Sequence, residues 1–128
     1  IGLGQIFLRK AEAPDGGNDL APSVHRLSRR RGKMLGVLTH HWAKADKIDE
    51  ARRLLDRNGE AQSKAQGFVS RHTLIAHGNP AKITTLVVWT SDDVYDAWRA
   101  SPQRATAMSG ADRLWAKPPE SERFQVVD

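Results

Sequence analysis

Residues 83–102 read ITTLVVWTSDDVYDAWRASP, and this stretch decides the fold. Polar and apolar residues alternate up to Trp89, which is typical of a half-buried β-strand. Ser91 is a good helix N-cap, and the two aspartates after it fall in the first turn, where the helix dipole favours acidic side chains. Pro102 stops this helix and suits the first turn of another. The stretch therefore predicts a strand, a short capped helix and a second helix.

The residues on either side predict the rest of the domain. Apolar residues recur at three- and four-residue steps between residues 48 and 65, which is typical of one buried helix face. Asn58-Gly59 falls inside that helix and predicts a kink or a split. Pro118-Pro119 ends the helical region, so the last strand is expected after it. The expected strands are residues 34–42, 68–77, 82–90 and 123–128, with a turn at 78–80.

The order of these elements is β-α-β-β-α-β, which predicts the α+β fold class. It is the order of the ferredoxin-like split βαβ sandwich, a four-stranded antiparallel sheet with helices on one face. The other sheet face also carries apolar residues, and the chain has no further element to cover it. A second copy can cover it, so we expect a homodimer in which two sheets pack face to face.

The composition of the chain excludes several kinds of functional site and a membrane-spanning segment. The chain has 128 residues, 39% of them hydrophobic, which predicts one domain with a modest core. It has no cysteine, which excludes disulfides, thiolate nucleophiles and zinc–thiolate sites and suits a reducing compartment. No apolar run approaches the roughly 18 residues of a membrane span. We therefore expect a cytoplasmic protein that does not enter the membrane.

The net charge of +5 is concentrated near the start of the chain. Arg29-Arg30-Arg31 and two neighbouring basic residues, Arg26 and Lys33, precede a domain in which charges nearly balance. Residues 1–33 are therefore interpreted as an N-terminal extension, partly ordered, and residues 34–128 as the domain. A basic run without interleaved aromatic residues is typical of a solvated surface, which argues against nucleic acid as the partner.

Four segments together resemble the antibiotic-biosynthesis monooxygenase family. They are Met34 to Trp42, Gln66-Gly67-Phe68, Val88-Trp89, and Trp98-Arg99-Ala100-Ser101-Pro102, and the likeness extends over residues 34–128. The resemblance implies a dimeric α+β barrel with a pocket between helices and sheet. It also implies oxidation of an aromatic or quinol-type small molecule by O2, with no metal or flavin cofactor. Relatives that degrade haem carry a histidine ligand where this chain has Met108, and this difference weighs against haem.

Two adjacent histidines are the candidate catalytic residues. His40 and His41 lie on one predicted strand and therefore face opposite sides. The one that faces the pocket can deprotonate a phenol, because an ordinary histidine pKa near ~6.5 suits a general base. Both sides of the strand carry apolar residues, so the alternation does not decide between the two. The alternative for each is a partly buried histidine with only a structural hydrogen bond.

Candidate substrate-binding residues come from three other segments. Trp89 can stack on a flat substrate, since the resemblance implies that the tryptophan ending this strand lines the pocket, although a purely structural role is equally compatible. His72 can approach the other histidines across the sheet, but its spacing predicts no metal site. Arg104, like Arg71, can neutralise an anionic substrate or a developing oxyanion, with an ordinary surface charge as the alternative.

The sequence thus predicts a cofactor-independent monooxygenase that oxidises an aromatic or quinol-type compound with O2. The alternative is a non-catalytic small-molecule-binding or stress-response module on the same fold, because a fold does not determine a function. An open pocket that holds Trp89 and one histidine would favour the enzyme. A pocket filled by side chains would favour the binding module.

Overall fold

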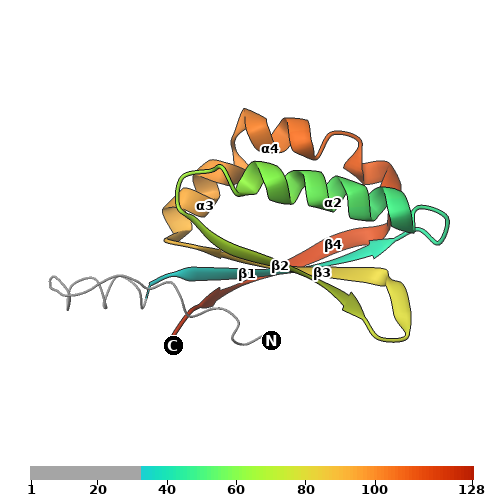
Figure 1. Ribbon diagram of the computed structural model, residues 1–128, viewed down its shortest axis with the longest axis horizontal. Helices are drawn as coiled ribbons and strands as arrows, with labels where there is room; N and C mark the ends of the chain where they lie inside the picture. The colour runs from blue at the N-terminus through green and yellow to red at the C-terminus, as the bar shows by residue number, and fades with distance from the viewer. Residues whose placement is uncertain (1–32) are drawn as a thin grey trace, which may run out of the picture.

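A computed structural model describes residues 33–128, so the predicted extension, apart from its last residue, lies outside the described residues. The chain forms a four-stranded antiparallel sheet in the order β2-β3-β1-β4 (Figure 1). The elements are, in chain order, β1 (Leu35–Ala43), α2 (Ile48–Gln62), β2 (Phe68–Ala76), β3 (Asn79–Trp89), α3 (Asp92–Arg99), α4 (Pro102–Ala107), the 3-10 helix η1 (Ala111–Leu114) and β4 (Trp115–Gln125).

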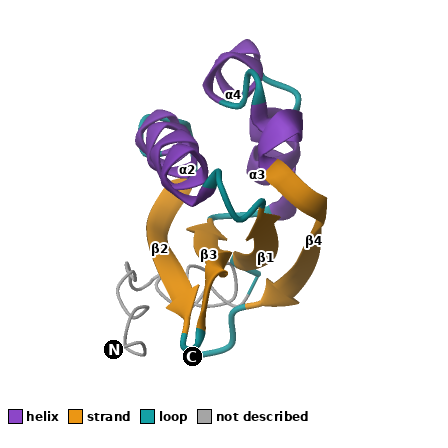
Figure 2. Ribbon diagram, turned by 90° about the vertical axis from the view of Figure 1, so that its right-hand side faces the viewer, coloured by secondary structure: helices purple, strands orange, loops and turns teal. Residues whose placement is uncertain are grey.

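The helices form a second layer on one side of the sheet. Figure 2 shows α2, α3 and α4 together above it, whereas no helix of the described residues covers its other side. Strand order and layering confirm the predicted ferredoxin-like α+β fold. None of the helices within residues 33–128 has both the length and the apolar character needed to cross a membrane.

Strand β1 sorts its side chains between the two faces, because successive strand residues point to opposite sides. Leu35, Val37 and His41 are buried on the helix side, where Val87 and Ile83 of β3 lie opposite Val37 and His41. The intervening residues, which face away from the helices, are Gly36, Leu38, His40 and Trp42. This register decides what the sequence left open: His41 faces the helices and His40 does not.

Helix α2 runs unbroken through Asn58-Gly59, so the predicted kink or split is wrong. Glycine in a helix interior lowers stability by about 1 kcal/mol relative to alanine, which is a weak preference that packing can override. The buried face of α2 includes Leu54, Leu55 and Asn58 and packs against the sheet and η1. Packing of α2 against its neighbours therefore outweighs the weak helix propensity of Gly59.

Strand β4 begins earlier than predicted, at Trp115 instead of Arg123, and Pro118-Pro119 lies within it. The strand is at the edge of the sheet, where a proline without an N–H removes no essential ladder bond. The register with β1 also shifts between His40 and Trp42, and neither proline has a partner in that register. The prolines thus occupy a bulge, and the expectation that they separate helix from strand was wrong.

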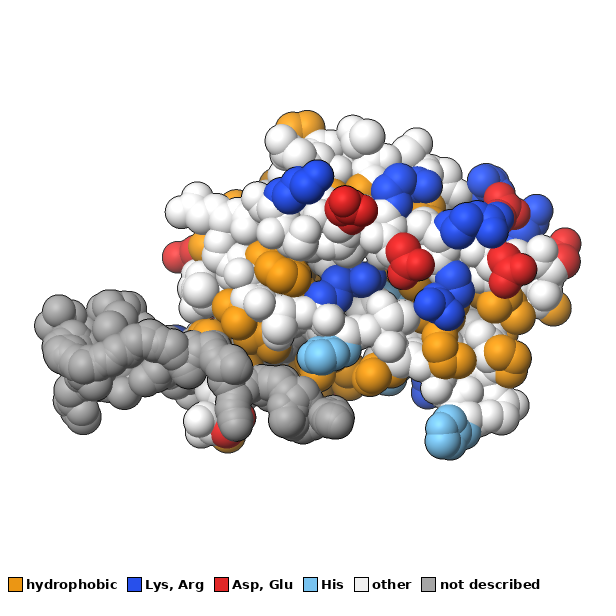
Figure 3. All heavy atoms as spheres, in the orientation of Figure 1, with side chains coloured by type: hydrophobic (Ala, Val, Ile, Leu, Met, Phe, Trp, Pro, Cys, Tyr) orange, Lys and Arg blue, Asp and Glu red, His pale blue; other side chains and the backbone are white. Residues whose placement is uncertain are grey.

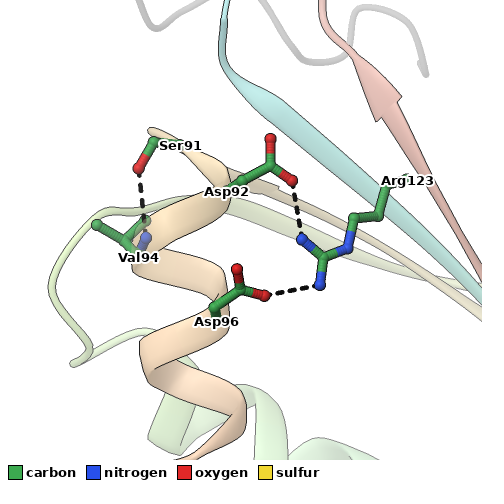
Figure 4. A network of polar contacts seen from close by, with 5 residues as sticks. All are labelled: Ser91, Asp92, Val94, Asp96 and Arg123. Atoms are coloured by element: carbon green, nitrogen blue, oxygen red, sulfur yellow. Dashed lines mark hydrogen bonds and ion pairs between the residues drawn. The ribbon is translucent and has the colours of Figure 1, made fainter.

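Helix α3 is fixed at its start and along its flank. As predicted, Ser91 caps it: the Val94 backbone N–H donates to the Ser91 hydroxyl at 3.3 Å. Arg123 of β4 donates to Asp92 at 2.8 Å and to Asp96 at 2.7 Å, one helical turn apart (Figure 4). These pairs are exposed and each contributes below about 1 kcal/mol, and together they link α3 to β4.

Candidate active-site cavity

A cavity of about 340 Å³ lies between the sheet and the helix layer. Its floor comes from β1 and β3 and includes Val37, Thr85 and Val87. Helices α2, α3 and α4 close it from above, and β4 reaches its rim with Ser121. The space is not filled by side chains. Among the described residues that line it, the members that carry functional groups are Thr39, His41, Asn58, Gln62, Arg71, Thr85, Tyr95, Arg99, Arg104 and Ser121.

Two amide residues of α2 line this cavity and have unpartnered oxygens. Asn58 and Gln62 are four residues apart, so they lie on the same helix face. Both residues are buried, at 8% and 6% exposure, yet neither Asn58 Oδ1 nor Gln62 Oε1 has a hydrogen-bond partner. A buried polar atom without a partner costs about 1–3 kcal/mol. A hydroxyl or N–H of a bound molecule would remove that cost.

Arg71 enters the cavity from β2 and crosses α2 where that helix has no side chain. Its Nη2 donates to the Leu55 carbonyl oxygen at 2.9 Å and its Nη1 to Thr73 Oγ1 at 3.3 Å. Its Nε is buried without a partner. A Cβ added to Gly59 would collide with Nη1 and lie 2.7 Å from Cζ of Arg71. The glycine that was predicted to break the helix instead provides the space for this guanidinium.

His41 is held in its neutral form. The pKa of His41 falls from its ordinary value of 6.5 to about 4, chiefly because burial disfavours the charged ring, with smaller contributions from the charges of Arg71 and His40. His41 Nδ1 lies 3.0 Å from the Ile83 carbonyl oxygen. A carbonyl only accepts, so Nδ1 carries the proton and Nε2 keeps its lone pair. His41 therefore offers a weak base at neutral pH.

The five predicted site residues separate into three groups. His41 and Arg104 line the cavity. His40 and His72 lie on the far face of the sheet, where His40 Nδ1 is 2.8 Å from Thr84 Oγ1 and His72 is paired in register with Leu86. Trp89 is fully buried and is not among the described lining residues, but its ring stacks 6.1 Å from that of Trp98, which does line the cavity.

Asn58 and Gln62 were not singled out by the sequence analysis. A signal for them existed, because both fall on the apolar stripe of α2 beside Leu54 and Leu55, and a polar residue on a buried face is informative. The sequence pattern does not show whether a residue of another element forms a hydrogen bond with either amide. Among residues 33–128, no group of three or more histidine, aspartate or glutamate side chains is placed to hold a metal ion.

The family model for antibiotic biosynthesis monooxygenase matches residues 34–109, well over half of the chain. The chain belongs to the antibiotic biosynthesis monooxygenase family. The residues matched include β1, all of α2, and the strand–helix stretch around Trp89 on which the resemblance was based. No curated protein matches the chain.

Solved structures share the fold of this family member at low sequence identity. A conserved protein from Methanosarcina mazei Go1 has a TM-score of 0.70 at 18% identity, covering 76% of this chain and 96% of that one. SnoaB, a cofactor-independent oxygenase from Streptomyces nogalater, has a TM-score of 0.68 at 16% identity, covering 75% and 95%. Rv0793 from Mycobacterium tuberculosis has a TM-score of 0.68 at 17% identity, covering 75% and 97%.

The lowered pKa of His41 predicts a loss of stability in acid. The His41 side chain takes up a proton near pH 6.5 in the unfolded chain and only near pH 4 in the folded chain, so its contribution to the unfolding free energy falls between these values and stays constant below them. From pH 7.5 to pH 5, His41 should account for a loss of about 2 kcal/mol. Urea unfolding of the His41→Asn variant, whose amide can still donate to the Ile83 carbonyl, should show that much less acid sensitivity.

The exposed His77 supplies the matched control for this comparison. The His77→Asn variant should lose stability in acid as the unchanged protein does. Equal pH dependence in the His41→Asn variant and the unchanged protein would contradict the buried, neutral state of His41.

Proposed function

We propose that this protein is a cofactor-independent monooxygenase that oxidises an aromatic or quinol-type small molecule with O2 in the cavity between sheet and helices. The observation that carries the proposal is the set of buried, unpartnered polar atoms on residues that line this cavity: Asn58 Oδ1, Gln62 Oε1 and Arg71 Nε. Membership of the family supports the reaction class, and SnoaB is an oxygenase with this fold. Unpartnered donors and acceptors at an open cavity are suited to a ligand with hydroxyl and carbonyl oxygens.

The proposed reaction needs no external reductant. The substrate loses a proton to form an electron-rich anion, which passes one electron to O2, and the radical pair combines to a hydroperoxide. Loss of water then converts a ring CH2 group to C=O, so one oxygen atom enters the product and the other leaves in water. The substrate supplies all four electrons. The protein's part is to form the anion and to exclude bulk water from it.

The charge at the cavity decides how that anion forms. A phenol has a pKa near 10, so transfer of its proton to a base with a pKa of about 4 is uphill by about 8 kcal/mol. His41 alone therefore forms little anion. The guanidinium of Arg71, with unpartnered Nε, stabilises the anion and lowers the pKa of the substrate. In this proposal Arg71 drives deprotonation and His41 accepts the proton.

Oxygen uptake tests the proposal directly. The full chain is mixed with a panel of quinols and anthrone-like compounds while dissolved O2 is recorded. We expect uptake, with kcat/KM reduced at least about tenfold in the Arg71→Gln and Asn58→Leu variants, because each removes one polar group from the cavity. The exposed Arg53 gives a charge-matched control, and His40 a control on the far sheet face, so Arg53→Gln and His40→Asn should keep full activity.

Two results would contradict the proposal. No uptake with any compound would favour the non-catalytic small-molecule-binding or stress-response module. Uptake that is the same in the Arg71→Gln and Asn58→Leu variants would place the reaction outside this cavity.

We further propose that the protein works as a homodimer. What supports this is the sheet face that no helix of the described residues covers, on which Phe124 is 44% and Leu74 41% exposed. In the register, Phe124 pairs with Gly36, two residues from Leu38, and Leu74 pairs with Thr84, two residues from Leu86. Figure 3 shows charges of both signs over the helix layer and hydrophobic side chains along the sheet layer below it. Glu120 and Glu122 share this face in the register, and large apolar side chains left exposed among such polar residues are typical of a subunit interface.

Sedimentation equilibrium of the full chain should give twice the chain mass. The Leu74→Glu variant should shift the protein toward monomer, because the new charge would be buried between the subunits. Val127→Glu, at an 84% exposed position near the C-terminus, is the control and should remain dimeric. A monomer at micromolar concentration would contradict the proposed assembly.

A further inference from the structure

The charged residues that line the cavity are all cations. Arg71, Arg99 and Arg104 contribute to the wall, and no aspartate or glutamate does so among the described residues. None of the three takes part in an ion pair within residues 33–128. Arg99 is exposed at the mouth and Arg104 is half-buried, so water screens them, whereas the Nε of Arg71 is sealed from solvent.

An unpaired guanidinium in such a place is unfavourable unless something else compensates it. Removing a charge from water costs several kcal/mol, and buried cations are therefore normally paired with an acid. Here the two hydrogen bonds that Arg71 donates go to neutral oxygens, those of Leu55 and Thr73. They orient the guanidinium without neutralising it. Asp56 attracts the guanidinium without forming an ion pair, but burial outweighs this attraction and lowers the pKa of Arg71. Its counter-charge is therefore expected to arrive with the ligand.

Position 59 points to the same requirement. A glycine in the middle of a helix lowers stability relative to alanine. An alanine there would collide with the far end of the Arg71 side chain, which is flexible enough to move away. The backbone of α2 would tolerate the change, so folding alone does not require the glycine. The missing side chain at position 59 leaves the space in which the guanidinium lies at the cavity.

On this basis we propose that the ligand of this cavity is an aromatic hydroxy acid, a compound that carries a carboxylate beside its phenolic hydroxyl. The carboxylate and the phenolic oxygen beside it share the guanidinium of Arg71, which is the specificity residue and also stabilises the anion left when the hydroxyl proton passes to His41. Further hydroxyl groups of the ligand donate to the amide oxygens of Asn58 and Gln62. A planar guanidinium matches a planar carboxylate, and hydrogen bonds between charged groups are about twice as strong as neutral ones. This inference rests on the proposed function, because it takes the same cavity as the substrate site.

Anaerobic binding to the full chain tests the inference without turnover. Calorimetry compares 1-hydroxy-2-naphthoate with its neutral amide, 1-hydroxy-2-naphthamide, which has nearly the same shape. We expect the carboxylate to bind about ten- to a hundredfold more tightly than the amide. Arg71→Gln should bring this ratio close to one. Arg53→Gln, which removes an exposed arginine of α2, should leave the ratio unchanged.

Gly59→Ala separates specificity from folding. We expect the variant to unfold at the same or a higher temperature than the unchanged protein, because alanine favours the helix, and yet to lose most of the preference for the carboxylate. Equal binding of carboxylate and amide by the unchanged protein would overturn the inference, as would a preference that survives in Arg71→Gln. Selective binding without any oxygen uptake in air would overturn the proposed oxygenase reaction and leave this inference standing.

Discussion

The guanidinium of Arg71 occupies the space that a side chain at position 59 would fill, and the character of the cavity depends on that contact. The contact explains why α2 carries a glycine at a position where alanine would favour the helix. Asn58 and Gln62, on the same buried face of α2, line the cavity together with this charge. A cation, two amides and a neutral imidazole thus meet in one partly closed space between a sheet and a helix.

The alternation of strand β1 gives the two adjacent histidines different environments. His41 is turned toward the helices and loses its charge to burial, while His40 is turned away and lies beside Thr84 on the face that we propose for dimer formation. The same alternation in β2 sends Arg71 to the cavity and His72 to the far face. Adjacent residues of one strand therefore serve different proposed roles, one in the cavity and the next at the dimer interface.

Much of the fold could be predicted because local signals and long-range packing agree there. The stretch from Ile83 to Pro102 contains its own strand pattern, cap and stop, and the structure follows it. The local sequence signals gave wrong predictions where a residue distant in sequence but close in space determines the local structure. Gly59 is kept by Arg71, twelve residues away, and Pro118-Pro119 is tolerated because β4 is an edge strand with a bulge. The cavity was predicted only in outline, since unpartnered atoms are a property of the packed structure.

The nitrogen resonance of the Arg71 side chain gives the most direct test of the central claim, which is that this guanidinium is the ligand-binding group of the cavity. The Nε–H signal of Arg71 can be followed by NMR while an aromatic hydroxy acid is added to the ¹⁵N-labelled full chain without oxygen. The account predicts a large, saturable shift of that signal and no comparable shift of Arg53. A saturable shift at other residues that leaves the Arg71 signal unchanged would contradict it.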